Sequence, residues 1–138
     1  MIIPMLKGLA FTLRRFFSRP ITIQYPEEKI PPGQRWRGVQ YFEKDERGKT
    51  RCVACGLCMV ACPSQCISIE TAEDEAGRRY PLTYTLDATR CIYCGYCEEA
   101  CPVGAIFMGK TYEWVENQRR PLLMDTENLL EQKKYNPS

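Results

Sequence analysis

Histidine is absent from the 138-residue chain. A chain without histidine has no Ser-His-Asp triad, no Cys-His nucleophile pair and no Cys₂His₂ zinc finger. It also cannot hold a Rieske cluster or a histidine-ligated haem. Any catalysis or metal binding must therefore rest on thiolates, carboxylates or the backbone.

Long hydrophobic runs are absent as well. The longest apolar stretch, MIIPMLKGLAFTL, is interrupted by Pro4 and Lys7. It falls well short of the ~20 residues that a membrane span needs. It does not resemble a signal peptide, because its positive charges follow the apolar residues and no small-residue cleavage site appears. We therefore expect a chain without a membrane span or an export signal, whose thiols lie in a reducing compartment.

The net charge is only +2, but the charges are unevenly distributed. Residues 1–51 carry 11 basic and 5 acidic side chains, whereas residues 52–110 carry 4 and 7. A basic arm indicates an anionic partner such as phospholipid headgroups, an acidic protein surface or nucleic acid. We expect no nucleic-acid binding, because no helix-turn-helix, zinc-finger or RNA-binding aromatic pattern accompanies the charge.

Residues 1–19 are predicted to hold an amphipathic helix over 5–18. The apolar residues of this segment recur at three- and four-residue steps, which places them on one helix face. Lys7, Arg14 and Arg15 lie largely on the other face. Such a helix can lie on an anionic membrane surface or dock on a partner, which is the interpretation we favour. The alternative is an ordinary surface helix that covers the protein's own core.

Residues 20–51 are predicted to form an extended, proline-rich arm. Four prolines within its first half forbid a long helix. Alternation at Ile21, Ile23 and Tyr25 favours a short strand, and residues 39–42 favour another. We expect this arm to wrap a neighbouring protein. The alternative is a disordered linker, against which its aromatic side chains argue.

Nine cysteines are present, and eight of them form two identical patterns. CVACGLCMVACP begins at Cys52, and CIYCGYCEEACP begins at Cys91. Both read C-x₂-C-x₂-C-x₃-C-P, and eight of sixteen positions match between residues 52–67 and 91–106. The chain therefore contains an internal duplication in which each copy is half of a cluster-binding unit.

The spacing is typical of cysteines that bind two [4Fe–4S] clusters. Three cysteines at two-residue gaps let a tight loop fold its sulfurs around one cluster, and Gly56 and Gly95 let the backbone approach closely. The fourth cysteine is expected to begin a short helix that points away, so that its sulfur reaches the other cluster. The predicted ligand sets are Cys52, Cys55, Cys58 and Cys101 for the first cluster, and Cys91, Cys94, Cys97 and Cys62 for the second. Zinc and disulfides are the weaker alternatives.

Cys66 is the ninth cysteine and stands outside both predicted ligand sets. Its counterpart in the second copy is Ala105, which cannot ligate iron. The duplication therefore assigns Cys66 to packing.

Residues 52–110 are predicted to form an α+β, ferredoxin-like domain. Residues 67–70 and 84–86 alternate as strands joined by a turn over 74–78, and residues 106–108 form the matching strand after the second motif. Because so little apolar core is available, the clusters themselves are expected to support folding.

Residues 111–138 are predicted to be a C-terminal docking tail. Asp125 or Thr126 is expected to cap a short helix that carries Leu129 and Leu130. A plain solvated tail is the alternative.

The combination of these features resembles a known family, subunit I of NADH-quinone oxidoreductase (respiratory complex I). The resemblance covers nearly the whole chain. It rests on the tandem cysteine motif, the basic helix and the segment ITIQYPEEKIPPGQRWRG. Tyr25-Pro26-Glu27-Glu28, Arg35-x-Arg37-Gly38 and Cys62-Pro63-x-x-Cys66 narrow it beyond ferredoxins in general.

The resemblance implies an electron-transfer subunit of a proton-translocating NADH:quinone oxidoreductase in the respiratory chain. Its two [4Fe–4S] clusters would relay electrons in the peripheral arm towards the quinone-proximal cluster of a neighbouring subunit. Its partners would be the other peripheral-arm subunits and the membrane-arm junction, where the N-terminal helix would lie. A bacterial member, peripheral on the cytoplasmic face of the inner membrane, is expected. No catalytic site of its own is expected, nor direct NADH binding, because no GxGxxG turn exists.

Two other classes share the cysteine core. One is the ferredoxin-like subunit of a related membrane hydrogenase, formate hydrogenlyase or photosynthetic NDH-like complex. The other is a free soluble ferredoxin, although a shuttle needs neither the basic helix nor the proline-rich arm.

Overall fold

The computed structural model describes residues 2–135 and comprises two units, Met1–Pro32 and Gly33–Ser138. The first unit contains helix α1, Ile2–Phe16, which begins and ends earlier than the predicted 5–18. Pro4 is tolerated in it because the N–H groups of a first turn have no helical partner.

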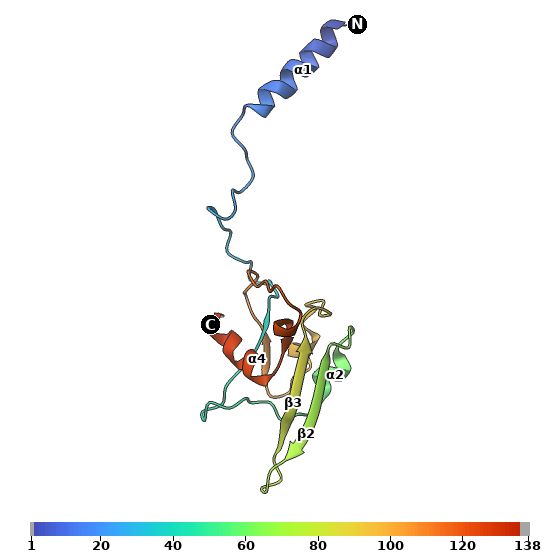
Figure 1. Ribbon diagram of the computed structural model, residues 1–138, viewed down its shortest axis with the longest axis vertical. Helices are drawn as coiled ribbons and strands as arrows, with labels where there is room; N and C mark the ends of the chain where they lie inside the picture. The colour runs from blue at the N-terminus through green and yellow to red at the C-terminus, as the bar shows by residue number, and fades with distance from the viewer. Residues whose placement is uncertain (1, 136–138) are drawn as a thin grey trace. The chain divides into compact units, whose positions relative to one another are not determined.

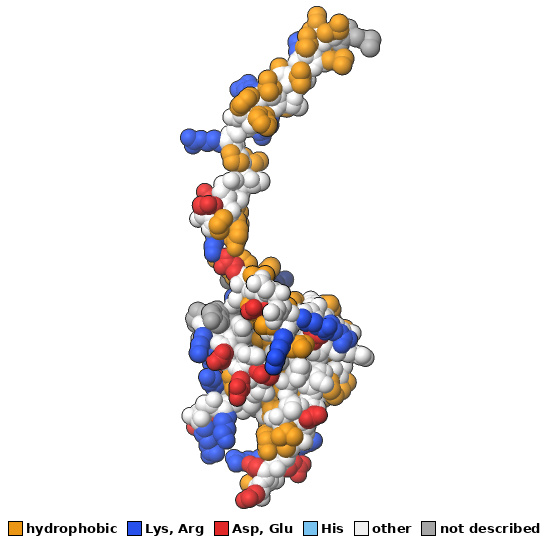
Figure 2. Space-filling model, viewed as in Figure 1, with side chains coloured by type: hydrophobic (Ala, Val, Ile, Leu, Met, Phe, Trp, Pro, Cys, Tyr) orange, Lys and Arg blue, Asp and Glu red, His pale blue; other side chains and the backbone are white. Residues whose placement is uncertain are grey.

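The apolar side chains of helix α1 are exposed to solvent within the first unit. None of its described residues is buried, and Phe11 and Phe16 are among the most exposed. Figure 2 shows hydrophobic side chains along this helix, with lysine and arginine side chains between them. Arg14 and Arg15 lie in the last turn, where positive charge complements the helix dipole. Across residues 2–135, no helix is long and apolar enough to cross a membrane.

The strand expected at Ile21, Ile23 and Tyr25 does not form. Residues 17–32 adopt turns and bends without regular pairing, and all of them are exposed. The alternation of apolar residues was misleading, because a strand also needs a neighbouring strand to pair with its N–H and C=O groups. Among the described residues of this unit there is no such neighbouring strand.

The second unit is built from two small antiparallel sheets (Figure 1). Strand β1, Gln40–Phe42, pairs with β4, Ile106–Met108, so that Phe42 lies opposite Ile106. Strands β2, Ile67–Glu73, and β3, Arg79–Asp87, form the long hairpin, and β5, Leu123–Met124, adds to β3. The strands predicted within this unit are thus present, and the hairpin extends further than 67–70 and 84–86.

The hairpin turn has a clear local cause. Asp74 accepts hydrogen bonds from the N–H groups of Ala76 and Arg78 and forms an ion pair with Arg78 at 2.8 Å. Gly77 has a φ of 71°, which glycine adopts at little cost. The expectation of a turn over 74–78 is confirmed.

The hydrophobic core lies between the sheets and the C-terminal segment. Its largest fully buried side chains are Phe42, Tyr84, Leu86, Ile106, Met124 and Leu129. They come from β1, β3, β4, β5 and the C-terminal helix, so every strand except the hairpin partner β2 contributes at least one. A core of this size is small for a domain and leaves stability to other sources.

The compact unit is wider than the predicted 52–110 domain on both sides. It begins at Gly33 and includes β1, which lies in the range 20–51 that was expected to be an arm. The physical reason is that Gln40–Phe42 completes a sheet with β4, while the prolines responsible for the extended character all precede Gly33.

The C-terminal segment folds back on the same core. It contains 3₁₀ helices η1, Arg120–Leu122, and η2, Lys133–Tyr135, on either side of β5 and helix α4, Thr126–Gln132. The Asp125 carboxylate accepts the Asn128 N–H at 2.8 Å and caps α4, as one of the two predicted alternatives states. Leu129 is fully buried in the core, and Lys133 pairs with Glu43 just after β1.

Candidate metal centre

The two cysteine motifs adopt the same backbone conformation. Residues with positive φ recur at equivalent places: Ala54 with Tyr93, Gly56 with Gly95, and Gln65 with Gly104. Each loop turns back at its left-handed glycine and then enters a one-turn helix, which is α2, Leu57–Ala61, or α3, Tyr96–Glu99. The duplication in the sequence is therefore also a duplication of local structure.

The place of the fourth cysteine differs from expectation. The short helices begin just after the glycines and carry the third cysteines, Cys58 and Cys97. Cys62 is the C-cap of α2, and Cys101 follows the C-cap of α3. The helix thus separates the third and fourth cysteines by one turn, instead of starting at the fourth.

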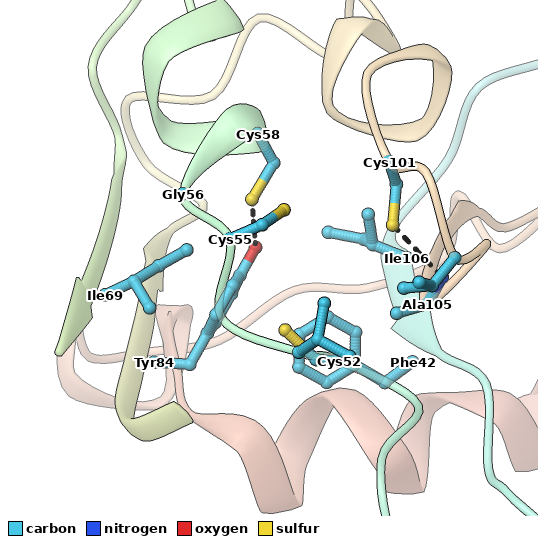
Figure 3. A pocket seen from close by; sticks show the side chains of 12 residues that line it. Phe42, Cys52, Cys55, Gly56, Cys58, Ile69, Tyr84, Cys101, Ala105 and Ile106 are labelled. Carbon is cyan, nitrogen blue, oxygen red and sulfur yellow. Dashed lines mark hydrogen bonds between the residues drawn. The ribbon is translucent and has the colours of Figure 1, made fainter. Parts of the chain in front are cut away.

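The first predicted ligand set lines one cavity (Figure 3). Its empty space measures about 320 Å³, part of it open to solvent, and its lining includes Cys52, Cys55, Cys58 and Cys101. Figure 3 shows these four side chains around a common space, with Cys101 entering from the second motif. The rest of the wall is mainly apolar and includes Phe42 and Ile106.

The second predicted set lines a second cavity of about 290 Å³, with Cys62, Cys91, Cys94 and Cys97 in its wall. Here Cys62 comes from the first motif. Cys66, Gln40 and Ser64 also line it. Each cavity therefore collects three cysteines of one motif and the fourth of the other.

The arrangement fits a multi-iron cluster better than a single ion. Over residues 2–135, no three His, Cys, Asp or Glu side chains lie close enough together to hold one metal ion. A cubane presents four irons at separate corners, each needing one thiolate, and so keeps its ligands further apart than tetrahedral zinc does. The four thiols of each predicted set match the donor set of a [4Fe–4S] cluster.

Backbone N–H groups point at sulfur in both cavities. Ala54 and Tyr93 each donate to the first cysteine of their motif, Cys52 and Cys91, at 3.4 Å. The Ala105 N–H donates to Cys101 at 3.2 Å. Such bonds stabilise negative charge on sulfur and favour thiolate ligands.

Burial favours the protonated thiols before a metal binds. It is the largest cause that raises the pKa of Cys52 and Cys58, and it raises the pKa of Cys97 to about 12. A metal or cluster binds thiolates, so its binding must displace these protons. The structure therefore predicts proton release on loading.

Cys62 and Cys66 behave in opposite ways. Burial opposes ionisation of Cys62, but hydrogen bonds from Ser64 and Cys66 outweigh it and lower the pKa of Cys62 to about 7. Burial is the largest cause that raises the pKa of Cys66 to about 12. The two sulfurs lie 3.5 Å apart, so ionisation of one thiol affects the other.

Arg37 supports the second motif and was not among the predicted site residues. Its guanidinium donates to the Cys94 carbonyl, lies 3.6 Å from the Glu99 carboxylate and packs over Gly95. A Cβ on Gly95 would come within 2.9 Å of the Arg37 Nε. The sequence RWRG contains this arginine, but its contact with the second cysteine motif depends on how the chain folds and could not be predicted from the sequence.

Comparison with known proteins places the chain in a class. Residues 51–105 match the model of a 4Fe-4S dicluster domain. This part of the chain is therefore a 4Fe–4S dicluster domain with mixed helix and sheet content.

Curated relatives narrow the class to one family. The chain is 44% identical over 133 residues to NADH-quinone oxidoreductase subunit I 1 of Geobacter sulfurreducens, covering 96% of this chain and all of the relative. It is 41% identical to subunit I 2 of Geobacter metallireducens, covering 95% and 99%. Against subunit I 2 of Rhizobium meliloti the identity is 48%, over 89% of this chain and 66% of the relative. The chain belongs to the NADH-quinone oxidoreductase subunit I family, which confirms the resemblance.

A solved structure is also similar. It is a chain of the membrane-bound sulfane sulfur reductase, an archaeal respiratory membrane complex, with a TM-score of 0.55 and 28% sequence identity. The match covers 80% of this chain and 55% of that chain. Part of the fold is thus shared with a chain of a membrane complex of different name.

Proposed function

We propose that this chain is an electron-transfer subunit of NADH:quinone oxidoreductase, relaying electrons through two [4Fe–4S] clusters. Cys52, Cys55, Cys58 and Cys101 hold the first cluster. Cys91, Cys94, Cys97 and Cys62 hold the second. The observation that carries the proposal is that each cavity gathers three cysteines of one motif and the fourth cysteine of the other, with Cys66 as an additional thiol in the second.

The mechanism is outer-sphere electron transfer. When bound, the clusters supply one-electron chemistry, and the protein supplies ligands, position and dielectric. Helix α2 links the two sites directly, since Cys58 at its start faces one cavity and Cys62 at its end lines the other. No residue is assigned to a substrate of the chain's own.

The parent assembly is proposed to be complex I, with this chain in its peripheral arm beside other subunits. In that setting α1 lies at the membrane-arm junction on the cytoplasmic face of a bacterial inner membrane. Its exposed apolar side chains and its basic last turn support that place, because such helices bind anionic membrane surfaces or partner helices. Proton translocation belongs to the whole complex.

The ligand sets are tested by iron analysis and EPR of the full-length chain. Wild-type protein is expected to hold iron for two four-iron clusters and to give signals from both when reduced. Cys55→Ser should lose the first cluster only, and Cys94→Ser the second only. Loss of both clusters or of neither in these variants would contradict the assignment.

A second candidate function is a ferredoxin-like subunit of a related membrane complex. The similarity to the archaeal sulfane sulfur reductase chain supports it. Purification from membranes in mild detergent separates the two, because co-purifying NADH-binding flavoprotein subunits indicate complex I. Recovery in the soluble fraction at high salt without detergent would instead indicate a free ferredoxin.

A further inference from the structure

Strand β1 presents different chemistry to the two cavities. Gln40 and Phe42 are both buried, while Tyr41 between them is only partly buried, as expected for alternate residues on one face of a strand. Gln40 lines the second cavity, and Phe42 lines the first. A two-residue step along one strand therefore exchanges an amide for an apolar ring.

Gln40 makes a specific contact with a proposed ligand. Its Nε2 lies 3.1 Å from the Cys91 Sγ, and the side chain is 1% exposed. A thiolate sulfur accepts and cannot donate, so the chemistry requires the NH₂ end of the amide to face Cys91.

The other end of the same amide is unsatisfied. Gln40 Oε1 is buried, and within the part of the chain that the structure describes it has no hydrogen-bond partner. Burying a carbonyl without a partner is unfavourable, so packing alone would favour an apolar side chain at this position. Glutamine supplies a hydrogen-bond donor to the Cys91 sulfur, which an apolar residue such as leucine would not.

The first cavity has a side-chain donor of a different kind, the Tyr84 hydroxyl. It lies 3.9 Å from the Cys58 Sγ, a longer contact than the 3.1 Å between Gln40 and Cys91. Gln40 also lies outside the duplicated segments 52–67 and 91–106, so the duplication supplies no counterpart to it. The two sites share backbone N–H donors but differ in this side-chain donor.

We propose that Gln40 raises the reduction potential of the second cluster and thereby makes the two clusters inequivalent. Reduction adds an electron whose charge is shared with the thiolate sulfurs. An N–H directed at Cys91 stabilises that charge and favours the reduced form. The inference rests on the proposed function, since it assumes a cluster in each cavity.

The test is a redox titration of the full-length chain with both clusters, followed by EPR. In Gln40→Leu, one cluster is expected to shift to a more negative potential while the other keeps its wild-type value. Unchanged potentials at unchanged iron content would overturn the role of Gln40. A wild-type chain that lacks a second cluster would instead contradict the proposed function, so the two failures are distinguishable.

Tyr84→Phe is the matched control, because it removes a buried polar atom beside the first cavity. It should leave the potential of the second cluster unchanged. If it shifts that potential as Gln40→Leu does, the effect is a general response to core substitution and the proposal fails.

A measurement on wild-type protein covers the case in which Gln40→Leu does not retain iron. With glutamine side chains labelled with ¹⁵N, the reduced protein is expected to show hyperfine coupling between one cluster and an amide nitrogen. Absence of that coupling would overturn the proposal without any substitution.

Discussion

Cys62 and Cys66 pose the sharpest question at the residue scale. Both line the second cavity, and their sulfurs lie 3.5 Å apart. Proximity alone does not choose between them as the fourth ligand. The duplication does, because Cys62 corresponds to Cys101 while Cys66 corresponds to Ala105.

Cys66→Ser is therefore expected to keep both clusters, and Cys62→Ser to lose the second. The serine at position 66 preserves size and leaves all eight proposed ligands in place. Iron content and the EPR spectrum of each variant measure the outcome. Loss of half the iron from Cys66→Ser, or full iron in Cys62→Ser through takeover by its neighbour, would refute the assignment.

Gly38, the last residue of the segment RWRG, lies in a tight backbone contact outside the cysteine motifs. Its N–H donates to the Gly109 carbonyl at 2.8 Å, and a Cβ at this position would lie 2.2 Å from the Thr111 carbonyl oxygen. The obstructing atoms belong to the backbone, so they cannot move aside as a side chain would.

Gly38→Ala should destabilise the holo protein by about 1–3 kcal/mol, the usual cost of overpacking a tight site. Gly33→Ala is the control, because a Cβ there meets nothing within 4 Å. Urea unfolding of the two variants provides the measurement. Equal stability of both would show that the backbone at Gly109 and Thr111 shifts freely.

At the scale of elements, the features that could be predicted were those with a regular residue pattern, namely the cysteine groups and the hairpin. The cysteine spacing predicted two ligand groups, and those groups line two cavities. The hairpin β2–β3 followed from alternation and a strong turn around Asp74. Strand β5 was missed because two residues, Leu123–Met124, carry no period. The start of α2 was misplaced because the left-handed Gly56, and not Cys62, sets it.

Helix α4 belongs to the folded body and is more than a docking tail. It packs against β1, and Leu129 is fully buried there.

Leu129→Ala should cost about 2–5 kcal/mol of stability, since it leaves a cavity in a small core. Val115→Ala, at a side chain that is 87% exposed, should change stability little. Similar unfolding midpoints for the two variants would mean that α4 does not contribute to the core.

At the scale of the whole molecule, composition marks where the compact unit begins but does not show what holds it there. The four prolines of residues 20–51 all precede Gly33, the first residue of the unit. What decides the boundary is the pairing of β1 with β4, a contact between segments far apart in the chain. Single-sequence patterns do not report such long-range pairing.

The cluster-free protein is expected to be largely unfolded. The two cavities lie inside a body whose fully buried side chains are few, so removing the clusters would leave the cysteine loops without support. Near-UV circular dichroism after chelation of iron measures this. The iron-loaded Cys66→Ser variant serves as the folded reference. A native-like spectrum of the iron-free chain would contradict the expectation.

The exchange of ligands between the motifs also has a consequence for biosynthesis. On the proposed sets, a chain leaving the ribosome shows three ligands of the first cluster by Cys58 but waits for Cys101 to complete the set. Leu129, which closes the core over β1, emerges later still. Cluster insertion is therefore a late event in the life of the nascent chain. A translation product that stops before Cys101 would offer the iron–sulfur assembly machinery only incomplete sites.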